Sequence, residues 1–221
     1  MVGTRVGIVI PALNEASSIE AVVRLSATFG TPIVVDDGSS DGTGCIAAAL
    51  GAMVVRHEHN RGYDASLNSG FLKADELGVE FVITIDADGQ HNPTLIEKCI
   101  ELLDSGADVV VGIRDKRQRF AENIFAHVTR SLYGVHDPLC GFKGYRISIY
   151  RALGHFDSYA SIGTELALFA MRNGYKLKQL PVHVRERLGK PRFGQGWAAN
   201  RKILKAMVMG FMKIPYEQDR G

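Results

Sequence analysis

Short apolar runs alternate with amphipathic stretches along the first half of the chain. Apolar runs of strand length occupy residues 6–10, 33–35, 53–55, 81–85 and 109–112. Between the first two runs, Ile19, Val22 and Val23 recur with the spacing of one helical face. Similar arguments predict helices up to about residue 28 and at residues 44–50, 63–77 and 93–103. Strands that alternate with helices over short connections are typical of an α/β fold with a mainly parallel sheet and helices on both faces.

The second half of the chain is less regular. Its pattern predicts helices at residues 120–133, 147–153, 164–173 and 197–214, and a strand at residues 177–184. Residues 136–146 are rich in turn formers and then read as a strand, and the basic, glycine-containing residues 185–196 are predicted to form a loop. We therefore expect a catalytic domain at residues 1–196, followed by an amphipathic C-terminal helix and tail at residues 197–221.

Composition limits the class of protein. A chain of 221 residues with 46% hydrophobic residues can build one globular domain with a core. Its net charge of +2 argues against a dedicated nucleic-acid binder. The three cysteines form no C-x-x-C pair, which indicates reduced thiols and a cytoplasmic protein. We expect no signal peptide before the first strand, and no apolar run approaches the roughly 20 residues of a membrane span.

The final predicted helix has two interpretations. Its apolar residues lie on one side, and lysines and arginines are also present. The apolar side can pack on the domain or on a partner helix. It can also lie in a membrane surface with the cations at the lipid headgroups, which would place the protein at the inner face of the membrane. The sequence leaves both interpretations open.

An alternating acidic motif follows the apolar run at residues 81–85. Asp86, Asp88 and Gln90 point to the same side if the backbone stays extended, because side chains of a strand alternate. Two carboxylates and an amide oxygen suit Mg²⁺ or Mn²⁺, which prefer oxygen ligands and keep waters or phosphate oxygens. The alternative is a helix N-cap, since Asn92-Pro93 resembles a helix start. A cap needs only one Asp, so the sequence favours the metal site.

Other polar clusters also follow predicted strands, at Asn14/Glu15, Asp36/Asp37, Asn60/Arg61 and Arg114. Ligands of open α/β sheets bind along this edge. The chain has neither a G-x-G-x-x-G motif nor a Walker A loop. The phosphates of a nucleotide would therefore be neutralised by a metal and arginines, and Asp36 and Asp37 could accept hydrogen bonds from a base or ribose.

Several motifs together resemble those of one enzyme family. In chain order they are IPALNE (residues 10–15), VVDDGSSDGT (34–43), NRGYDASLNSG (60–70), DADGQH (86–91), VVGIR (110–114), DPLCGFKGYR (137–146) and PVHVRERLGK (181–190). Their order is similar to that of the family-2 inverting glycosyltransferases of GT-A fold, which is Rossmann-like. The resemblance is greatest to the dolichol-phosphate mannose synthase-like branch, the polyprenyl-phosphate glycosyltransferases.

The resemblance implies roles for individual residues. The base and ribose of a UDP- or GDP-sugar donor would be lined by Pro11, Leu13, Glu15 and Asp37. The donor diphosphate would be held through Mg²⁺ or Mn²⁺ by Asp86, Asp88 and Gln90. Arg114 would lie near both donor and acceptor phosphates, Arg187 would close over the diphosphate, and Arg119 and Asn123 would contact the acceptor phosphate. The candidate catalytic residues are Asp88, Arg114, Glu165 and Arg187.

The acceptor is predicted from a missing residue. Many relatives that act on hydroxyl groups carry an Asp after a Glu at the position of Glu165, whereas Leu166 follows here. A hydroxyl acceptor needs a general base, but a lipid phosphate is already ionised. The sequence thus favours a polyprenyl-phosphate acceptor, although Glu165 could itself be the base or a structural partner of an arginine. The alternatives are transfer to a glycan hydroxyl, or a non-catalytic nucleotide-sugar-binding subunit. A homo-oligomer or a membrane partner subunit is compatible with each.

Overall fold

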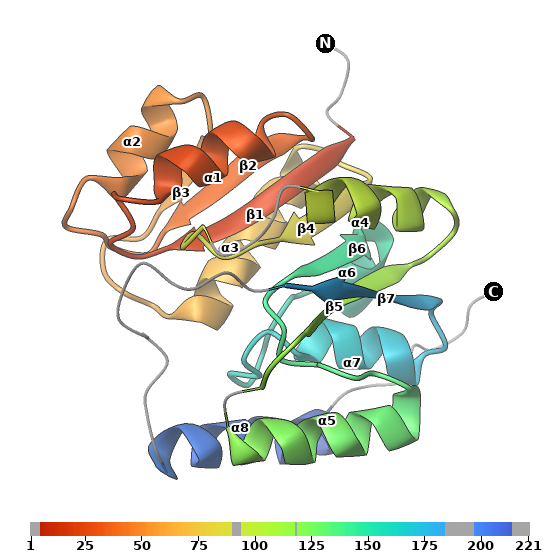
Figure 1. Ribbon diagram of the computed structural model, residues 1–221. Coiled ribbons are helices and arrows are strands. Elements are labelled where there is room, and N and C mark those ends of the chain that lie inside the picture. The colour runs from red at the N-terminus through yellow and green to blue at the C-terminus, as the bar shows by residue number, and fades with distance from the viewer. Residues whose placement is uncertain (1–4, 90–93, 118, 184–196, 214–221) are drawn as a thin grey trace.

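A single mixed sheet organises the part of the chain that the computed structural model describes, which is residues 5–89, 94–117, 119–183 and 197–213 (Figure 1). The strands of this part are β1 (Val6–Ala12), β2 (Thr31–Asp36), β3 (Met53–Arg56), β4 (Phe81–Thr84), β5 (Val109–Arg114), β6 (Lys143–Arg146) and β7 (Leu177–Val182). Their order across the sheet is β3-β2-β1-β4-β6-β5-β7. Strand β6 runs antiparallel to β4 and β5, and the other neighbouring strands pair parallel.

Helices cover both faces of the sheet, as the alternating pattern predicts. One face packs on α1 (Ile19–Ser26), α2 (Thr43–Ala49) and α4 (Thr94–Asp104), and the other on α3 (Tyr63–Glu76), α6 (Ile147–Leu153) and α7 (Glu165–Arg172). Adjacent strand residues belong to opposite cores: Ile8 and Ile10 face the first set of helices, whereas Val9 faces the second. The mainly parallel α/β class, with helices on both faces of the sheet, is confirmed.

The central strand β6 is the part of the sheet that the sequence describes least well. Its residues carry only a weak strand pattern after a turn-rich segment. In the structure β6 fills the gap between β4 and β5, and Tyr145 pairs with Val82 on one side and Val109 on the other. Because β6 enters the sheet in the opposite direction, its first residue lies at the edge where the parallel strands end.

Helices α5 (Phe120–Tyr133) and α8 (Trp197–Lys213) lie side by side beyond α7 (Figure 1). Small side chains let α8 approach α5 closely, because its buried positions include Ala199, Ala206 and Gly210. The side chain of Asn200 also accepts a hydrogen bond from the backbone N–H of Ala121, at 3.2 Å. That N–H belongs to the first turn of α5, where backbone donors have no partner within the helix. Within the described residues no helix is both long and apolar enough to cross a membrane.

A glycine brings α3 close to the sheet. A Cβ atom on Gly70 would lie 2.3 Å from Cγ1 of Val9, which is far inside van der Waals contact. Both Gly70 and Val9 are buried, so neither can move towards solvent. The approach of α3 matters for function because the helix begins beside the carboxyl ends of β1 and β2.

We predict that Gly70→Ala destabilises the protein by about 1–3 kcal/mol, because the added methyl group overpacks the contact with β1. Urea unfolding followed by circular dichroism measures this change. Leu72→Ala on the same helix is the control, since Leu72 is 53% exposed and should change stability by no more than about 0.5 kcal/mol. A gain of about 1 kcal/mol in Gly70→Ala, the effect of helix propensity alone, would contradict the close packing.

Candidate functional site

The parallel strands end at one edge of the sheet, and the predicted site residues lie there. Asp37 comes directly after β2, and Asp86 comes two residues after the end of β4. Arg114 is the last residue of β5. The antiparallel β6 adds Lys143 at the same edge. The structure therefore brings the acidic and basic candidates together in the arrangement that the strand order requires.

Hydrogen bonds join the loop after β1 to the loop after β2. The backbone N–H of Asn14 donates to Ser39 Oγ and that of Glu15 to Thr43 Oγ1, each at 2.8 Å. Asn14 has a φ of +48°, a left-handed conformation that Asn tolerates better than most residues. The predicted donor-binding residues Pro11, near the end of β1, and Leu13 and Glu15, on the loop that follows, are each half-buried. The two loops thus form one fixed end of the site.

The carboxylate of Asp37 is buried and already has three donors. Its Oδ1 contacts His57 Nδ1 at 2.7 Å and accepts the backbone N–H of Arg61 at 2.8 Å, and its Oδ2 accepts the N–H of Gly62 at 2.8 Å. His57 Nε2 in turn contacts Ser69 Oγ at 2.9 Å. These bonds fix the start of α3. A carboxylate has about four lone-pair positions, so Oδ2 keeps one for a ligand, and the role of Asp37 in base or ribose binding stays a prediction.

The acidic motif after β4 departs from the predicted extended backbone, because β4 ends at Thr84 and the chain turns at Ala87 and Asp88. Asp86 and Asp88 are half-buried, whereas Ile85 and Ala87 are 3% exposed and belong to the core. The two carboxylates are therefore accessible at this edge, and their joint role as metal ligands stays a prediction. Gln90, the third predicted metal ligand, lies outside the described residues.

Gly141, in the turn that precedes β6, packs closely against the carboxylate of Asp86. A Cβ atom on Gly141 would lie 2.6 Å from Oδ2 of Asp86, so glycine alone leaves room for the carboxylate here. Thr84 Oγ1 donates to the carbonyl of Gly141 at 2.7 Å and accepts the N–H of Lys143 at 3.2 Å. The turn is thereby fastened to the end of β4.

Lys143 places a buried amino group below this edge. Lys143 is 3% exposed, and its Nζ donates to the carbonyls of Cys140 at 2.6 Å and Gly163 at 3.1 Å. Burial lowers the pKa of Lys143, while negative charge on Cys140, Asp137 or Asp86 acts in the opposite direction. The sequence did not predict that Lys143 is buried at this edge, because lysine side chains are ordinarily exposed.

A loop with unusual backbone angles lies on the other side of Lys143. Ala160 and Ile162 have φ values of +59° and +58°, which are strained for residues with a Cβ and most of all for a β-branched one. Asp64 holds the loop by accepting the N–H groups of Ile162 at 3.3 Å and Gly163 at 2.6 Å. Burial raises the pKa of Asp64 to about 6. The loop is therefore fixed from both α3 and β6.

Glu165 lies at the start of α7 and is also buried. Its carboxylate accepts hydrogen bonds from the backbone N–H and hydroxyl of Ser158 and contacts His155 Nε2 at 3.0 Å. Its exposed fraction is 2%, and both oxygens have partners within the protein. This environment suits a structural anchor of the loop, although the partners are not the arginine that the sequence suggested. The general-base role of Glu165 stays a prediction.

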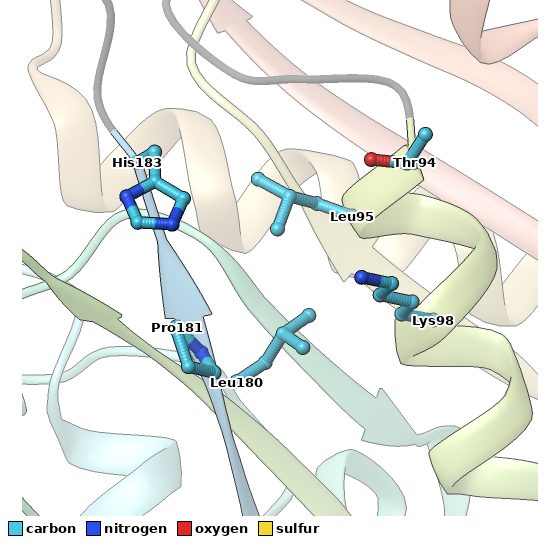
Figure 2. A pocket seen from close by; sticks show the side chains of 6 residues that line it. All are labelled: Thr94, Leu95, Lys98, Leu180, Pro181 and His183. Atoms are coloured by element: carbon cyan, nitrogen blue, oxygen red, sulfur yellow. The ribbon is translucent and has the colours of Figure 1, made fainter.

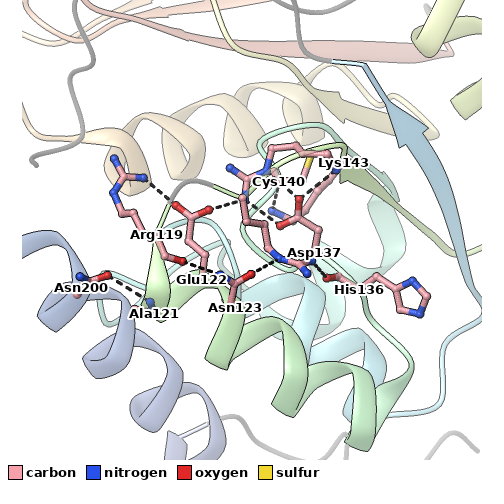
Figure 3. A network of polar contacts seen from close by, with 11 residues as sticks. Arg119, Ala121, Glu122, Asn123, His136, Asp137, Cys140, Lys143 and Asn200 are labelled. Atoms are coloured by element: carbon pink, nitrogen blue, oxygen red, sulfur yellow. Dashed lines mark hydrogen bonds and ion pairs between the residues drawn. The ribbon is translucent and has the colours of Figure 1, made fainter. Parts of the chain in front are cut away.

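Arg114 is held by two acidic residues (Figure 3). Its Nε and Nη2 donate to the two oxygens of Asp137 at 2.7 and 2.9 Å, and Nη2 also contacts Glu122 Oε2 at 3.3 Å. Burial alone would lower the pKa of Arg114, but the hydrogen bonds and charge of Asp137 raise it. Sequence reasoning assigned no role to Asp137 or Glu122, because only the fold brings them to the arginine.

The predicted acceptor contacts lie next to Arg114 at the start of α5. Arg119 Nη1 donates to Glu122 Oε1 at 2.8 Å, and Asn123 Oδ1 accepts from Arg117 Nε at 2.9 Å (Figure 3). Arg119, Asn123 and Arg114 thus form one cluster. Arg187 lies outside the described residues, so its predicted contact with the diphosphate stays a prediction.

A pocket of about 370 Å³ lies between α4 and the end of β7 (Figure 2). Lys98 and His183 are its polar side chains, and its walls are Thr94, Leu95, Leu180 and Pro181. His183 Nδ1 contacts Asp115 Oδ2 at 2.8 Å. The sequence did not predict this pocket, because its walls come from a helix and a strand more than eighty positions apart.

Comparison with known proteins gives the family. The description "Glycosyl transferase family 2" matches residues 7–162. A UDP-N-acetylglucosamine–dolichyl-phosphate N-acetylglucosaminyltransferase from Methanococcus voltae is 32% identical, over 79% of this chain and 83% of the relative. A polyprenol monophosphomannose synthase from Mycolicibacterium smegmatis is 27% identical, over 81% of this chain and 77% of the relative.

Solved structures give the same fold. Glucosyl-3-phosphoglycerate synthase from Mycobacterium tuberculosis superposes with a TM-score of 0.76 at 24% identity, over 99% of this chain and 82% of that chain. The same enzyme in complex with Mn²⁺, UDP and glucosyl-3-phosphoglycerate superposes with a TM-score of 0.74 at 23% identity, again over 99% of this chain and 82% of that chain. The match to the family description and the identity of the Methanococcus relative confirm what the motifs predicted: the chain belongs to glycosyl transferase family 2 and is a glycosyltransferase of GT-A fold.

Proposed function

We propose that this glycosyltransferase transfers a sugar from a nucleoside-diphosphate donor to the phosphate of a polyprenyl phosphate, with inversion at the anomeric carbon. The observation that carries the proposal is the position of two kinds of charge at one sheet edge. The carboxylates of Asp86 and Asp88 follow β4, and the Arg114–Arg119 cluster follows β5, with only β6 between these strands. The carboxylates suit a cation that binds the donor diphosphate, and the arginines suit the phosphate of the acceptor.

The donor set of the site fits Mg²⁺ or Mn²⁺. The half-buried Asp86 and Asp88 offer only oxygen ligands, and Gly141 leaves space beside the Asp86 carboxylate. Among the described residues no group of three His, Cys, Asp or Glu side chains forms a closed metal cage. Two carboxylates suit an ion that completes its shell with water and diphosphate oxygens. When bound, such an ion stabilises the negative charge that develops on the leaving diphosphate.

The proposal assigns a separate binding role to each of the other site residues. Asp86 and Asp88 would hold the ion, and Pro11, Leu13, Glu15 and Asp37 would line the base and ribose. Arg114 contributes a fixed positive charge between donor and acceptor, and Arg119 and Asn123 bind the acceptor phosphate. An acceptor phosphate oxygen attacks the anomeric carbon opposite the leaving diphosphate, so the new C–O bond forms as the old one breaks. Gln90 and Arg187, which lie outside the described residues, would add a metal ligand and a contact with the diphosphate.

The environment of Glu165 supports an ionised acceptor. Because its carboxylate already accepts bonds from Ser158 and contacts His155, it is poorly placed to take a proton from a hydroxyl. A phosphate acceptor has no such proton to lose. The relatives from Methanococcus voltae and Haloferax volcanii, which are named for transfer to dolichyl phosphate, support the same acceptor class.

The C-terminal helix supports contact with a membrane surface, which a lipid acceptor requires. Trp197, Val208 and Met212 are exposed on one face of α8, with Arg201 and Lys205 between them on the same face. Apolar residues together with cations suit the boundary between acyl chains and anionic headgroups. In this proposal residues 197–221 form the membrane-facing appendage of a catalytic domain at residues 1–196. A homo-oligomer or a membrane partner subunit is compatible with the proposal and is not needed by it.

We predict that Asp88→Asn reduces sugar transfer by at least about a hundredfold, because loss of one carboxylate weakens the metal and the charge stabilisation of the leaving group. The assay is transfer of radiolabelled sugar to undecaprenyl phosphate with Mn²⁺. Asp104→Asn, on the exposed end of α4 at the opposite edge, is the control and should keep full activity. Near-normal turnover by a folded Asp88→Asn variant would reject the metal assignment.

We predict that the wild-type enzyme transfers sugar to undecaprenyl or dolichyl phosphate and forms no product with saccharide acceptors. A panel of UDP- and GDP-sugars with both acceptor classes, resolved by thin-layer chromatography, measures this. Product formed only on a saccharide would favour the hydroxyl-acceptor alternative. Donor binding without transfer or hydrolysis would favour the non-catalytic binding subunit.

We predict that Trp197→Ser combined with Met212→Ser weakens sedimentation with vesicles containing anionic phosphatidylglycerol, because both exposed apolar contacts with the acyl region are lost. Binding of the wild type should fall with added salt, since the cations of α8 contribute through screened electrostatics. Leu72→Ser, which changes an exposed leucine of α3, is the control. Equal sedimentation of all three proteins would show that α8 does not contact the lipid.

A further inference from the structure

Glu122 is a buried carboxylate between two guanidinium groups. It is 3% exposed; its Oε2 contacts Arg114 Nη2 at 3.3 Å and its Oε1 accepts from Arg119 Nη1 at 2.8 Å (Figure 3). Buried ion pairs seldom add net stability, because desolvation of the charges offsets their attraction. Net stabilisation therefore does not explain why one buried carboxylate pairs with two arginines, and a functional role is the better explanation.

The two arginines come from different parts of the fold. Arg114 is the last residue of β5, and its guanidinium donates hydrogen bonds to both carboxylate oxygens of Asp137. Arg119 immediately precedes α5. Glu122 bonds both groups at once, so its carboxylate sets the distance and orientation between a guanidinium fixed to the sheet and one fixed to the helix.

The backbone that carries Glu122 is itself fixed. Glu122 lies in the first turn of α5, and the neighbouring N–H of Ala121 donates to Asn200 of α8. The buried side chains of Ala121 and Phe125 hold the same turn against the core. Glu122 therefore cannot follow an arginine that moves, and each arginine must adapt to it.

Both arginines stay accessible from solvent. The exposed fractions of their side chains are 20% for Arg114 and 19% for Arg119. Arg114 Nη1 donates no hydrogen bond to a described residue, so the N–H groups of that nitrogen remain for a ligand. Two oriented guanidinium groups are well suited to the oxygens of a phosphate monoester.

We propose that Glu122 is a positioning residue: its carboxylate holds Arg114 and Arg119 as a preorganised pair that binds the phosphate monoester of the acceptor. This inference rests on the proposed function for the identity of the acceptor. Preorganisation strengthens binding because the side chains lose less freedom when the ligand arrives. Without Glu122, Arg114 would still be held by Asp137, but its orientation relative to Arg119 would have to be set by the phosphate itself.

Removal of the charge of Glu122 should change phosphate affinity in opposite directions for a positioning role and for simple electrostatics. Glu122→Gln removes a negative charge from the neighbourhood of an anion site, which by Coulomb attraction alone would tighten phosphate binding. The amide of Gln offers one accepting oxygen and places an N–H₂ donor against the second guanidinium. A positioning role therefore predicts weaker binding despite the more favourable charge.

The experiment is calorimetric titration of the full chain with geranyl phosphate, a water-soluble isoprenyl monophosphate. We expect Glu122→Gln to raise Kd by about tenfold, which corresponds to the loss of one hydrogen bond between charged groups. Glu97→Gln, on the exposed side of α4, should bind as the wild type does. Glu122→Asp keeps the charge but is one methylene too short to reach both arginines, so it should also bind more weakly.

Two further readouts test a purely structural loss. The melting temperature of Glu122→Gln should stay well above the temperature of the titration, which shows that the variant is folded, and its Kd for nucleoside diphosphate with Mn²⁺ should change little. KM for the lipid phosphate should rise more than kcat falls. Unchanged or tighter binding of geranyl phosphate by Glu122→Gln, or no binding by the wild type, would overturn the proposal. Wild type that binds geranyl phosphate but does not transfer sugar to a polyprenyl phosphate would contradict the proposed function and leave the positioning role of Glu122 supported.

Discussion

Parallel strand pairing forces charges of both signs to share one edge of the sheet. The strands β2, β4 and β5 deliver acidic and basic residues there, and the reversal of β6 adds a lysine between them. Charges gathered in a partly buried place are costly unless each has a partner. The described contacts supply such partners: Asp137 and Glu122 pair with Arg114, backbone N–H groups bind Asp37, and carbonyls bind Lys143. The fold can therefore keep these groups fixed before a substrate arrives.

This pre-arrangement explains how the site can act without a glycine-rich phosphate loop. A nucleoside diphosphate leaves with growing negative charge, and only groups already oriented towards it stabilise that charge without first reorganising. In the proposed function, the acidic pair after β4 serves the donor side and the arginines after β5 serve the acceptor side. The turn at Gly141 lies between them, touching Asp86 on one side and leading from Asp137 on the other.

The sequence predicts much of the fold and a smaller part of the site. Apolar runs and helical spacing give the strands and helices, and the rule that ligands bind where parallel strands end gives the edge. Ile85 and Ala87 are buried and Asp86 and Asp88 are half-buried, but the chain turns at Ala87 and Asp88, so the extended backbone from which the common direction of the two carboxylates was predicted is absent. The weak pattern of residues 143–146 did not reveal that this segment is a central strand, because its neighbours in the sheet come from distant parts of the chain.

The partners of the site residues could not be predicted for the same reason. Glu122 lies eight positions after Arg114, in the first turn of α5, and His57 reaches Asp37 from the position that follows β3. Neither contact leaves a local pattern, since it depends on how elements pack and not on residue spacing. Glu165 shows the opposite case: its position at a helix start was predicted, but its partners, Ser158 and His155, come from a preceding loop that only the structure reveals.

The most direct test of this account is a crystal structure with Mn²⁺ and the nucleoside diphosphate of the donor, in which anomalous scattering locates the ion. The account predicts one manganese peak that contacts the carboxylates of Asp86 or Asp88 and oxygens of the diphosphate, with Arg114 beside the phosphates. A diphosphate bound away from the end of β4, or one that lies there with no ion between it and these carboxylates, would contradict the central claim.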